Sequence, residues 1–367
     1  MKFTISREAF LKPLQLVVSV VERRQTLPVL SNVLIHLDGN QLSLTGTDLE
    51  VEIVGYAQLE GASESGEITV PARKLVDICK SLPDKAVINF SEDGGRMLIT
   101  SGRSRFTLST LSASEFPSVE EGAGQVEFSL TGVILKRLLE DTAFAMAQQD
   151  VRYYLNGMLW EATTGTLRAV ATDGHRLAMS HADMPFELPE KVQAIVPRKG
   201  VMELSRILHD DDTVSVVIGA NHVRVQGAEF RFTSKLIDGA YPDYERVLPR
   251  SGTKFINGTR EELRHGFARA AILSNEKYRG VRLQIEGNLL KITANNPEQE
   301  EAEEELVVDF EGDGSLEIGF NVNYLLDALN ALKGENARIS LTDSNSSALM
   351  ESPDFPGAVY VIMPMRL

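Results

Sequence analysis

Short stretches in which apolar and polar residues alternate dominate the chain. Residues 33–48, 157–173 and 281–296 each contain two such stretches, separated by AspGly, ThrGly or GlyAsn. An alternation of period two is typical of half-buried strands, and these dipeptides are typical of hairpin turns. The pattern therefore predicts antiparallel sheets built from hairpins.

Six other segments have apolar residues at the spacing of one helix face. Three of them follow short apolar strands at 3–5, 128–130 and 255–257; these helical segments are residues 7–17, 133–146 and 261–273. The other three are residues 70–79, 196–205 and 320–329. The sequence thus predicts two helices in each third of the chain.

The elements recur at a nearly constant offset. The ValPro pairs at 70 and 196 lie 126 residues apart, Phe3 and Phe128 lie 125 apart, and Phe255 follows Phe128 by 127. A constant offset across several elements indicates an internal repeat. We expect an α+β fold of three repeated domains, 1–124, 125–252 and 253–367, each with two helices packed on about eight antiparallel strands. The boundaries fall in turn-rich segments without periodicity.

The charge of the chain is strongly negative. Its 37 Lys and Arg residues face 52 Asp and Glu residues, a net charge of −15. This argues against tight DNA binding, which depends on cationic contacts to phosphates. However, the predicted helices are comparatively rich in Lys and Arg, while residues 298–305 are almost entirely acidic. If the helices share one surface, only that surface would attract DNA, and without base recognition.

Motifs for enzymatic chemistry are missing from the sequence. It contains no phosphate-binding glycine loop and no metal-ligand spacing, so we expect neither cofactor nor metal. The single Cys79 cannot form an internal disulfide and is expected to be a core residue in a reducing cytoplasm. The N-terminal residues do not have the pattern of a signal peptide, and no apolar run is long enough to span a bilayer.

Asp173 and His175 leave one enzymatic alternative open, a hydrolase or transferase built around these two side chains. The same position reads ThrAspLeu in the first repeat and AlaAsnAsn in the third. A turn that recurs with the repeat explains the pair better than catalysis does. A monomeric DNA-binding scaffold is the other alternative to a ring-forming protein.

The chain resembles the beta subunit of bacterial DNA polymerase III, the sliding clamp, along its whole length. Nine segments carry the resemblance together with the terminal ValIleMetProMetArgLeu: residues 26–32, 44–50, 101–111, 149–157, 171–178, 116–119, 241–249, 271–282 and 295–304. The resemblance implies a non-enzymatic processivity factor that encircles duplex DNA as a head-to-tail homodimer. Six domains would form the ring, and twelve helices would line its hole.

The resemblance also implies a dimer contact between the first and third domains. Its apolar residues would be Phe106, Leu108, Ile272 and Leu273. Its basic residues would be Arg96, Arg103 and Arg105, facing the acidic Glu298, Glu300, Glu301, Glu303 and Glu304. Such a heterologous contact closes into a ring only when the rotation per subunit permits it.

A second implied surface is a pocket for short linear motifs of polymerases, the clamp loader and repair proteins. The matching residues are Arg152, Leu155, Thr172, Gly174, His175, Arg176, Leu177, Pro242, Arg246, Val247, Tyr324, Val361, Met363, Pro364, Met365 and Arg366. The methionines suit such a role because flexible Met side chains adapt to varied ligands. The residues that match the family's DNA contacts are Arg24, Arg73, Gln149, Tyr153 and Tyr154.

Overall fold

The computed structural model describes residues 1–21, 27–117, 119, 124–249 and 252–366. The chain divides into two compact units, residues 1–135 with 199–236, and residues 136–198 with 237–367. Arg24, one of the predicted DNA contacts, lies outside the described residues. No helix among the described residues is long and apolar enough to cross a membrane.

The order strand, helix, three strands, strand, helix, three strands occurs first in β1 to β8. Its elements are β1 (Lys2–Ser6), α1 (Arg7–Val17), β2 (Asn32–Asp38), β3 (Gln41–Thr47), β4 (Val51–Gln58), β5 (Gly66–Pro71), α2 (Ala72–Ser81), β6 (Val87–Asp93), β7 (Arg96–Ser101) and β8 (Ser104–Ser109).

The same order recurs in the middle of the chain. Its elements are β9 (Gly124–Thr131), α3 (Gly132–Thr142), β10 (Gly157–Thr163), β11 (Thr166–Thr172), β12 (Arg176–Asp183), β13 (Val192–Pro197), α4 (Arg198–Ile207), β14 (Thr213–Gly219), β15 (His222–Gln226) and β16 (Phe230–Lys235).

The last third repeats the order with one additional short strand, β21. Its elements are β17 (Lys254–Thr259), α5 (Arg260–Ala271), β18 (Gly280–Glu286), β19 (Leu289–Asn295), β20 (Glu301–Val307), β21 (Asp309–Glu311), β22 (Leu316–Asn321), α6 (Val322–Ala331), β23 (Asn336–Leu341), β24 (Ala348–Glu351) and β25 (Ala358–Ile362). The predicted two helices and about eight strands per repeat are confirmed.

The helices begin directly where strands end, and polar side chains cap several of them. Ser6 accepts a hydrogen bond from the backbone N–H of Ala9, and Thr259 accepts one from Glu262 at 3.3 Å. The Thr259 hydroxyl also donates to the Glu262 carboxylate at 2.8 Å. These contacts satisfy backbone N–H groups that have no partner within the first helical turn.

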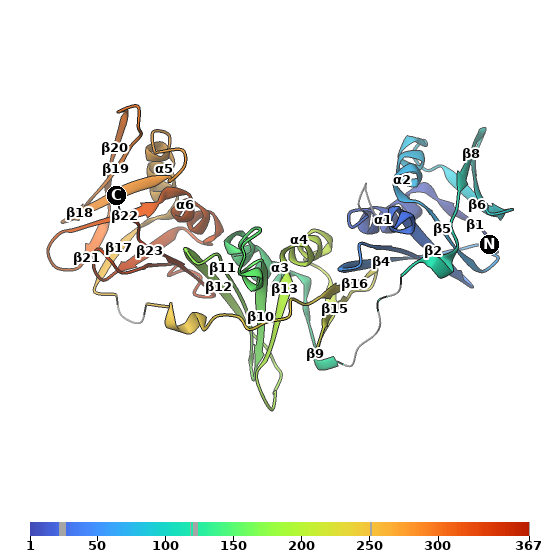
Figure 1. The fold of residues 1–367 in the computed structure, drawn as a ribbon, viewed down its shortest axis with the longest axis horizontal. Helices are drawn as coiled ribbons and strands as arrows, with labels where there is room; N and C mark the ends of the chain where they lie inside the picture. Colours follow the sequence, from blue (N-terminus) through green and yellow to red (C-terminus); the bar gives the residue numbers. More distant parts are fainter. Residues whose placement is uncertain (22–26, 118, 120–123, 250–251, 367) are drawn as a thin grey trace. The chain divides into compact units, whose positions relative to one another are not determined.

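Each compact unit contains one long sheet and one four-stranded sheet. In the first unit the long sheet has the order β5-β2-β3-β4-β16-β15-β14-β9, and the short sheet β1-β6-β7-β8. In the second unit the orders are β13-β10-β11-β12-β25-β24-β23-β17-β21 and β20-β19-β18-β22. The long sheets therefore join two repeats, through β4 with β16 and through β12 with β25. Figure 1 shows α5 and α6 side by side over the short sheet of the second unit.

The strand registers identify equivalent residues in the second half of each repeat. Facing residues run across four strands as Phe3–Phe90–Ile99–Phe106, Phe128–Val216–Val225–Phe232 and Ile256–Ile339–Met350–Tyr360. Phe106, Phe232 and Tyr360 are therefore equivalent.

A second set of registers aligns the first half of each repeat. Facing residues run as Ile35–Leu44–Gly55, Trp160–Ala169–Ser180 and Leu283–Ile292–Glu304. The last residues of these three rows are Gly55, Ser180 and Glu304. The residues two positions before them are therefore equivalent as well: Ile53, Ala178 and Ala302. At the two joined junctions, Phe232 faces Ile53 and Tyr360 faces Ala178.

Candidate functional site

The junction of β12 with β25 carries a buried apolar cluster. Its fully buried members are Leu159, Val170, Leu177, Ile195, Tyr244 and Val361. They lie next to one another because Leu159 faces both Val170 and Ile195 across the sheet, and Leu177 faces Val361. We call this group the junction cluster. Half-buried side chains pack against it, among them Tyr154, Tyr241, Val247 and Leu349.

The loop between β11 and β12 forms one side of the site. One Asp173 carboxylate oxygen accepts hydrogen bonds from the backbone N–H groups of His175 (2.9 Å) and Arg176 (3.1 Å). Gly174 has a φ of +88°, and a Cβ there would lie 2.9 Å from an Arg152 guanidinium nitrogen. The backbone conformation therefore favours glycine here, while the flexible Arg152 side chain could shift to make room for a Cβ.

Arg176 is held on every side within the second unit. Its guanidinium donates to the carboxylates of Asp173 and Asp327 and to the carbonyl of Phe144. It also lies over the Tyr324 ring, 4.5 Å from the centroid. A guanidinium that is both ion-paired and stacked on a ring holds the surrounding loop and helices together. Its charge is already used by these contacts and is not free for a ligand.

Arg152 remains more accessible. Its guanidinium donates to both carboxylate oxygens of Asp150, at 3.0 and 2.8 Å, and to the carbonyl of Asp173 at 3.1 Å. The hydrogen bonds from Arg152 lower the pKa of Asp150 to about 2. Arg152 thus connects the loop before β10 with the loop before β12, and the exposed Tyr153 follows it in the loop before β10.

The C-terminal segment closes the other side of the site. The Met363 N–H donates to the His175 carbonyl, and the Met365 N–H donates to the Gly319 carbonyl, both at 2.9 Å. Met363, Pro364 and Met365 are half-buried, while Arg366 is exposed. This part of the chain therefore continues from β25, an interior strand of the long sheet, with partly accessible apolar side chains.

Most of the residues predicted for the peptide pocket thus lie around one place. Leu177 and Val361 belong to the junction cluster, and Val247 packs on it. Leu155 is also buried, with 2% of the residue exposed. Pro242 and Arg246 are exposed on the segment after β16, beside the buried Tyr244.

The repeats show how unusual this junction is. At the β4–β16 junction the equivalents of Leu159, Val170, Leu177, Ile195 and Val361 are Leu34, Thr45, Glu52, Thr69 and Thr233. In the third repeat the equivalents of the first four are Arg282, Thr293, Glu301 and Gly319. The polar groups are partnered at the β4–β16 junction, where Arg231 lies 3.7 Å from Glu52 and the Asn32 amide donates to Thr69. Only the β12–β25 junction has an apolar floor at these positions.

Comparison with known proteins accounts for the whole chain. It matches the N-terminal domain of the DNA polymerase III beta subunit over residues 1–120, the central domain over 129–243 and the C-terminal domain over 245–366. The chain belongs to the DNA polymerase III beta subunit family. The resemblance inferred from its sequence motifs is thereby confirmed.

Individual relatives agree over their full length. The chain is 62% identical to the beta sliding clamp of Pseudomonas aeruginosa and 55% identical to that of Escherichia coli K12, with all of both chains covered. It also superimposes on the crystal structure of the Pseudomonas aeruginosa clamp bound to griselimycin with a TM-score of 0.98, at 62% identity and complete coverage of both chains. Like those beta clamps, the chain has three repeats of the same element order.

The residues matched to DNA contacts in the beta clamp family fall in both units. Arg73 is exposed on α2 in the first unit, and its guanidinium lies 3.4 Å from the Val21 carbonyl. Gln149 and Tyr153 are exposed on the loop before β10 in the second unit, where Tyr153 meets Tyr154 edge-on. An exposed tyrosine beside an exposed amide can contact phosphate or sugar groups without reading bases.

The residues matched to the dimer contact lie on two sheet edges. Phe106 and Leu108 are on β8, the last strand of its four-stranded sheet, and Arg96, Arg103 and Arg105 are exposed near it. Ile272 is 75% exposed at the end of α5, and the acidic residues lie on or beside β20, which is also an edge. Three of the carboxylates already have partners in their own chain, as Glu304 pairs with Arg269, Glu303 with Lys291 and Glu300 with Asn296.

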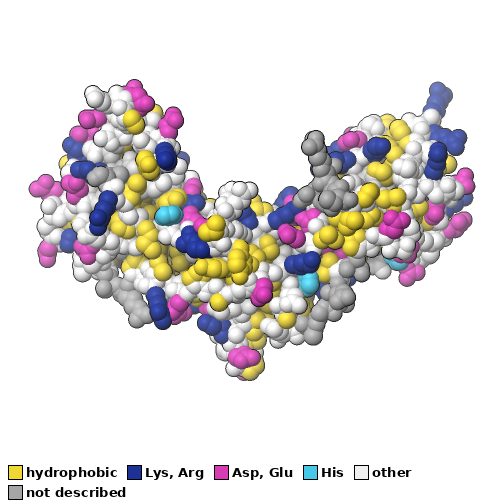
Figure 2. All heavy atoms as spheres, viewed as in Figure 1, with side chains coloured by type: hydrophobic (Ala, Val, Ile, Leu, Met, Phe, Trp, Pro, Cys, Tyr) yellow, Lys and Arg dark blue, Asp and Glu magenta, His cyan; other side chains and the backbone are white. Residues whose placement is uncertain are grey.

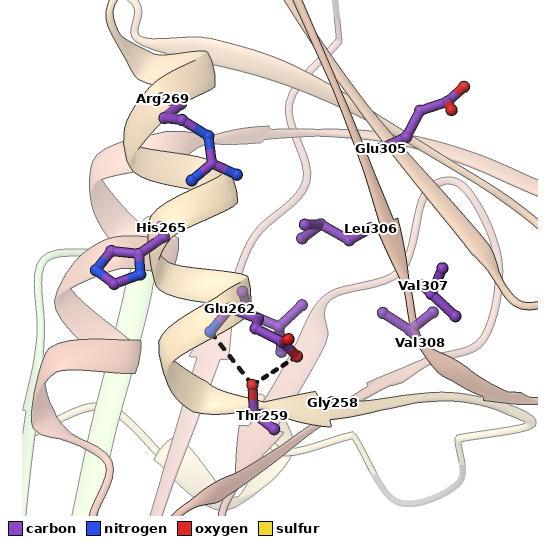
Figure 3. A pocket seen from close by; sticks show the side chains of 10 residues that line it. Gly258, Thr259, Glu262, His265, Arg269, Glu305, Leu306, Val307 and Val308 are labelled. Atoms are coloured by element: carbon purple, nitrogen blue, oxygen red, sulfur yellow. Dashed lines mark hydrogen bonds between the residues drawn. The ribbon is translucent and has the colours of Figure 1, made fainter.

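A cavity of about 390 Å³ lies between α5 and β20, away from the junction cluster. In Figure 3, Leu306 points toward α5, Glu305 points away from it, and His265 and Arg269 stand along the helix. None of the residues predicted for the peptide pocket lines this cavity. It borders the edge strand β20.

Sequence reasoning did not select several residues that build the site. Tyr244, Leu159, Val170 and Ile195 complete the floor, and Asp327 holds Arg176. The alternating pattern marked Leu159 and Val170 as strand residues, but only the register shows that they meet under Tyr244. Among the described residues, no group of three or more His, Cys, Asp or Glu side chains could hold a metal ion.

Proposed function

We propose that this protein is a DNA sliding clamp that encircles duplex DNA as a head-to-tail homodimer and tethers polymerases and other replication and repair proteins. Three domains per chain, 1–124, 125–252 and 253–367, would give the ring six domains. The observation that carries the proposal is that two edge strands, β8 and β20, are unpaired within the described chain, although their equivalents in the other repeats pair with one another.

The repeats indicate what these edges do. β4, β12 and β20 are equivalent, and so are β8, β16 and β25. β4 pairs with β16 and β12 pairs with β25, each in antiparallel fashion. The remaining members of the two sets, β20 and β8, complete the series only if β20 of one chain pairs with β8 of another. Two such junctions would close a dimer in which neither β8 nor β20 remains an open edge.

The same equivalence predicts the register of the dimer junction. Phe232 faces Ile53 and Tyr360 faces Ala178, so Phe106 would face Ala302 of the partner chain. Arg105 would then lie opposite Glu303. The matched apolar residues Leu108, Ile272 and Leu273 and the basic Arg96 and Arg103 would complete the contact with the acidic β20 region.

The peptide pocket is proposed at the junction cluster, with the sixteen matched residues named above as its floor and rim. The polar side chains at the equivalent positions of the other repeats support one such pocket per chain. The Pseudomonas aeruginosa beta clamp has been crystallised with griselimycin. We propose that this chain also binds griselimycin, and that it does so at the junction cluster. Partner proteins would insert short apolar motifs there.

Contacts with DNA are proposed at Arg24, Arg73, Gln149, Tyr153 and Tyr154. They would be few and independent of base sequence, because a closed ring is retained by topology and not by affinity. The protein would not catalyse a reaction itself. A separate ATP-driven loader would open the ring, and the protein would act in the bacterial cytoplasm, where the chromosome is.

Retention on circular DNA tests the proposal. After loading by the clamp loader of the same organism, the protein should stay on a nicked circle during gel filtration and leave once the circle is cut. A ring slides off a linear end, whereas a protein bound by affinity does not distinguish the two forms. Equal loss from circular and linear DNA would contradict encirclement. Light scattering should independently give twice the mass of one chain.

A further inference from the structure

A buried carboxylate lies beside the junction cluster. Glu161 is on β10, and only 2% of the residue is exposed. One of its oxygens accepts hydrogen bonds from the Arg168 guanidinium (2.9 Å) and the Tyr244 hydroxyl (2.7 Å), and the other accepts from the Gln193 amide (2.7 Å). Burial raises the pKa of Glu161, but these hydrogen bonds and the charges of Lys191 and Arg168 outweigh it and lower the pKa overall. The group is therefore a satisfied, charged anchor.

Tyr244 is the member of this network that does not come from the sheet. It begins the short 3-10 helix Tyr244–Arg246, in the segment that follows β16. The Arg168 guanidinium donates to its hydroxyl at 2.6 Å and lies 5.9 Å from the ring centroid. Its ring is buried in the junction cluster with Leu159 and Ile195. The hydrogen bonds of the hydroxyl and the burial of the ring together fix how closely this segment packs on the sheet and how it is oriented there.

The segment carries part of the proposed pocket rim. Pro242 lies two residues before Tyr244, and Arg246 and Val247 lie two and three residues after it. The Nε of Arg246 pairs with the Asp243 carboxylate at 2.7 Å, and the Arg246 side chain is 83% exposed. The position of these three residues therefore depends strongly on how Tyr244 is held.

The other repeats provide an internal comparison. The register places His36, Ser43 and Glu67 at the positions of Glu161, Arg168 and Gln193 in the first repeat. In the third repeat the same positions are Gln284, Lys291 and Glu317. Neither set contains a buried carboxylate: the His36 side chain is 49% exposed, and Gln284 donates to the Glu317 carboxylate, which is 51% exposed. The sheets of these repeats form without the network, so the repeat fold does not require it.

We propose that Glu161 and Arg168 are positioning residues for the peptide pocket, acting through Tyr244. They hold the Tyr244 hydroxyl so that Pro242, Arg246 and Val247 keep the arrangement that a peptide ligand needs. This inference rests on the proposed function of the pocket. Charge-assisted hydrogen bonds are directional, whereas apolar packing alone permits the ring to turn and slide. If the rim residues also adopt other arrangements, the apparent affinity for the peptide falls in proportion to the fraction of molecules whose rim is in the binding arrangement.

The variant Tyr244→Phe tests this role because it keeps the ring and removes only the hydroxyl. Griselimycin binding to the full-length protein would be measured by surface plasmon resonance. We expect the dissociation constant to rise by about threefold to tenfold, mainly through slower association. Amide hydrogen exchange should accelerate within residues 238–248 and stay unchanged in β8 and β20. The mass of the dimer and retention on circular DNA should remain those of the wild-type protein.

Tyr360→Phe is the matched control. Tyr360 is a buried tyrosine in the same sheet, and its hydroxyl has no hydrogen-bond partner among the described residues. This variant should bind griselimycin like the wild-type protein. Glu161→Gln, which keeps the shape of the side chain but not its charge, should weaken binding in the same direction as Tyr244→Phe.

The outcomes separate the two proposals. Wild-type affinity and wild-type exchange in Tyr244→Phe would overturn the positioning role while leaving the pocket intact. An equal loss of affinity in Tyr360→Phe would overturn it as well, because any buried hydroxyl would then have the same effect. Val247→Asp tests the pocket itself and should abolish binding. Failure of the wild-type protein to bind griselimycin would overturn the pocket and the positioning role together.

Discussion

At the scale of single residues, Asp173 shows how a reactive side-chain type can have a purely structural task. One of its carboxylate oxygens accepts from the N–H groups of His175 and Arg176. Asp48 does the same in the first repeat, accepting from Glu50 at 2.9 Å and Val51 at 2.7 Å. The turn at the end of the hairpin therefore accounts for Asp173, as the repeat comparison predicted from the sequence.

Cys79 leads to a prediction at the same scale. It is fully buried in α2, and burial raises the pKa of its thiol from 9.0 to about 12. The thiolate is the reactive species, so the native protein should not react with a thiol reagent such as Ellman's reagent at pH 8. Reaction should become complete after denaturation in guanidinium chloride.

The sign of the pH dependence follows from the raised pKa. The folded state favours the protonated thiol, so its contribution to stability is present below the unperturbed pKa of 9.0 and is lost as the pH rises toward 12. The midpoint of urea unfolding should therefore fall less steeply above pH 9 in Cys79→Ala than in the wild-type protein. Rapid labelling of the native protein at pH 8 would contradict this account.

At the scale of elements, the sequence predicted the helices and hairpins well but placed the second helix of each repeat two residues too early. The second helix of each repeat was predicted at 70–79, 196–205 and 320–329, and it lies at Ala72–Ser81, Arg198–Ile207 and Val322–Ala331. The two preceding residues end a strand instead, since Val70 faces Val33 and Val196 faces Met158. Apolar residues at a strand–helix border fit both patterns, and only the non-local strand pairing decides between them.

Pairing between repeats could not be predicted from the sequence pattern. The paired strands β4 and β16 are far apart along the chain, and so are β12 and β25. The alternation of apolar and polar residues shows which residues share a face of the sheet, but not which strand lies beside them. For the same reason the pattern did not reveal that Tyr244 meets Glu161. The pocket and interface residues came from the family resemblance, and their roles remain predictions.

A disulfide bond can test the predicted register of the dimer junction. If Phe106 faces Ala302, then Ser104 faces Glu304 of the partner, at the same type of antiparallel pair. Backbone hydrogen bonds from the Met363 N–H to the His175 carbonyl and from the Tyr56 N–H to the Glu229 carbonyl mark hydrogen-bonded pairs at the two junctions within the chain. Hydrogen-bonded and non-hydrogen-bonded pairs alternate along antiparallel strands. By this alternation, the pairs equivalent to Ser104 and Glu304 are non-hydrogen-bonded. Such pairs bring Cα atoms to about 4.5 Å, within reach of a disulfide. The double variant Ser104→Cys, Glu304→Cys should therefore form a covalent dimer on mild oxidation, seen by non-reducing gel electrophoresis.

The control is the double variant Ser104→Cys, Ala302→Cys. A shift of two residues along β20 separates the Cα atoms by about 8 Å, which is too far for a disulfide without backbone movement. The buried Cys79 should not take part in either variant. Equal cross-linking in both pairs, or preferential cross-linking in the control, would show that the register differs from the one the repeats predict.

At the scale of the whole molecule, the charge of −15 constrains how DNA can be held. Several helix cations are already paired, such as Lys199 with Asp48, Arg206 with Glu203 and Arg264 with Glu261. On the face drawn in Figure 2, Lys and Arg side chains lie singly or in small groups among acidic and neutral ones. A protein with a net negative charge, some of whose helix cations are already paired, makes weak, screened contacts with phosphates. Such contacts suit sliding, provided that a closed ring prevents dissociation.

Salt dependence separates retention by topology from retention by affinity. The double variant Ser104→Cys, Glu304→Cys would be loaded on a nicked circle under reducing conditions, oxidised, and passed through a column in about 1 M salt, where the Debye length is only about 3 Å. Electrostatic contacts are then lost, so affinity alone would not hold the protein, whereas a covalently closed ring should stay on the circle. Cutting the circle before the column should release it completely. Release from the uncut circle, with the dimer still cross-linked on a gel, would mean that the DNA does not pass through the ring.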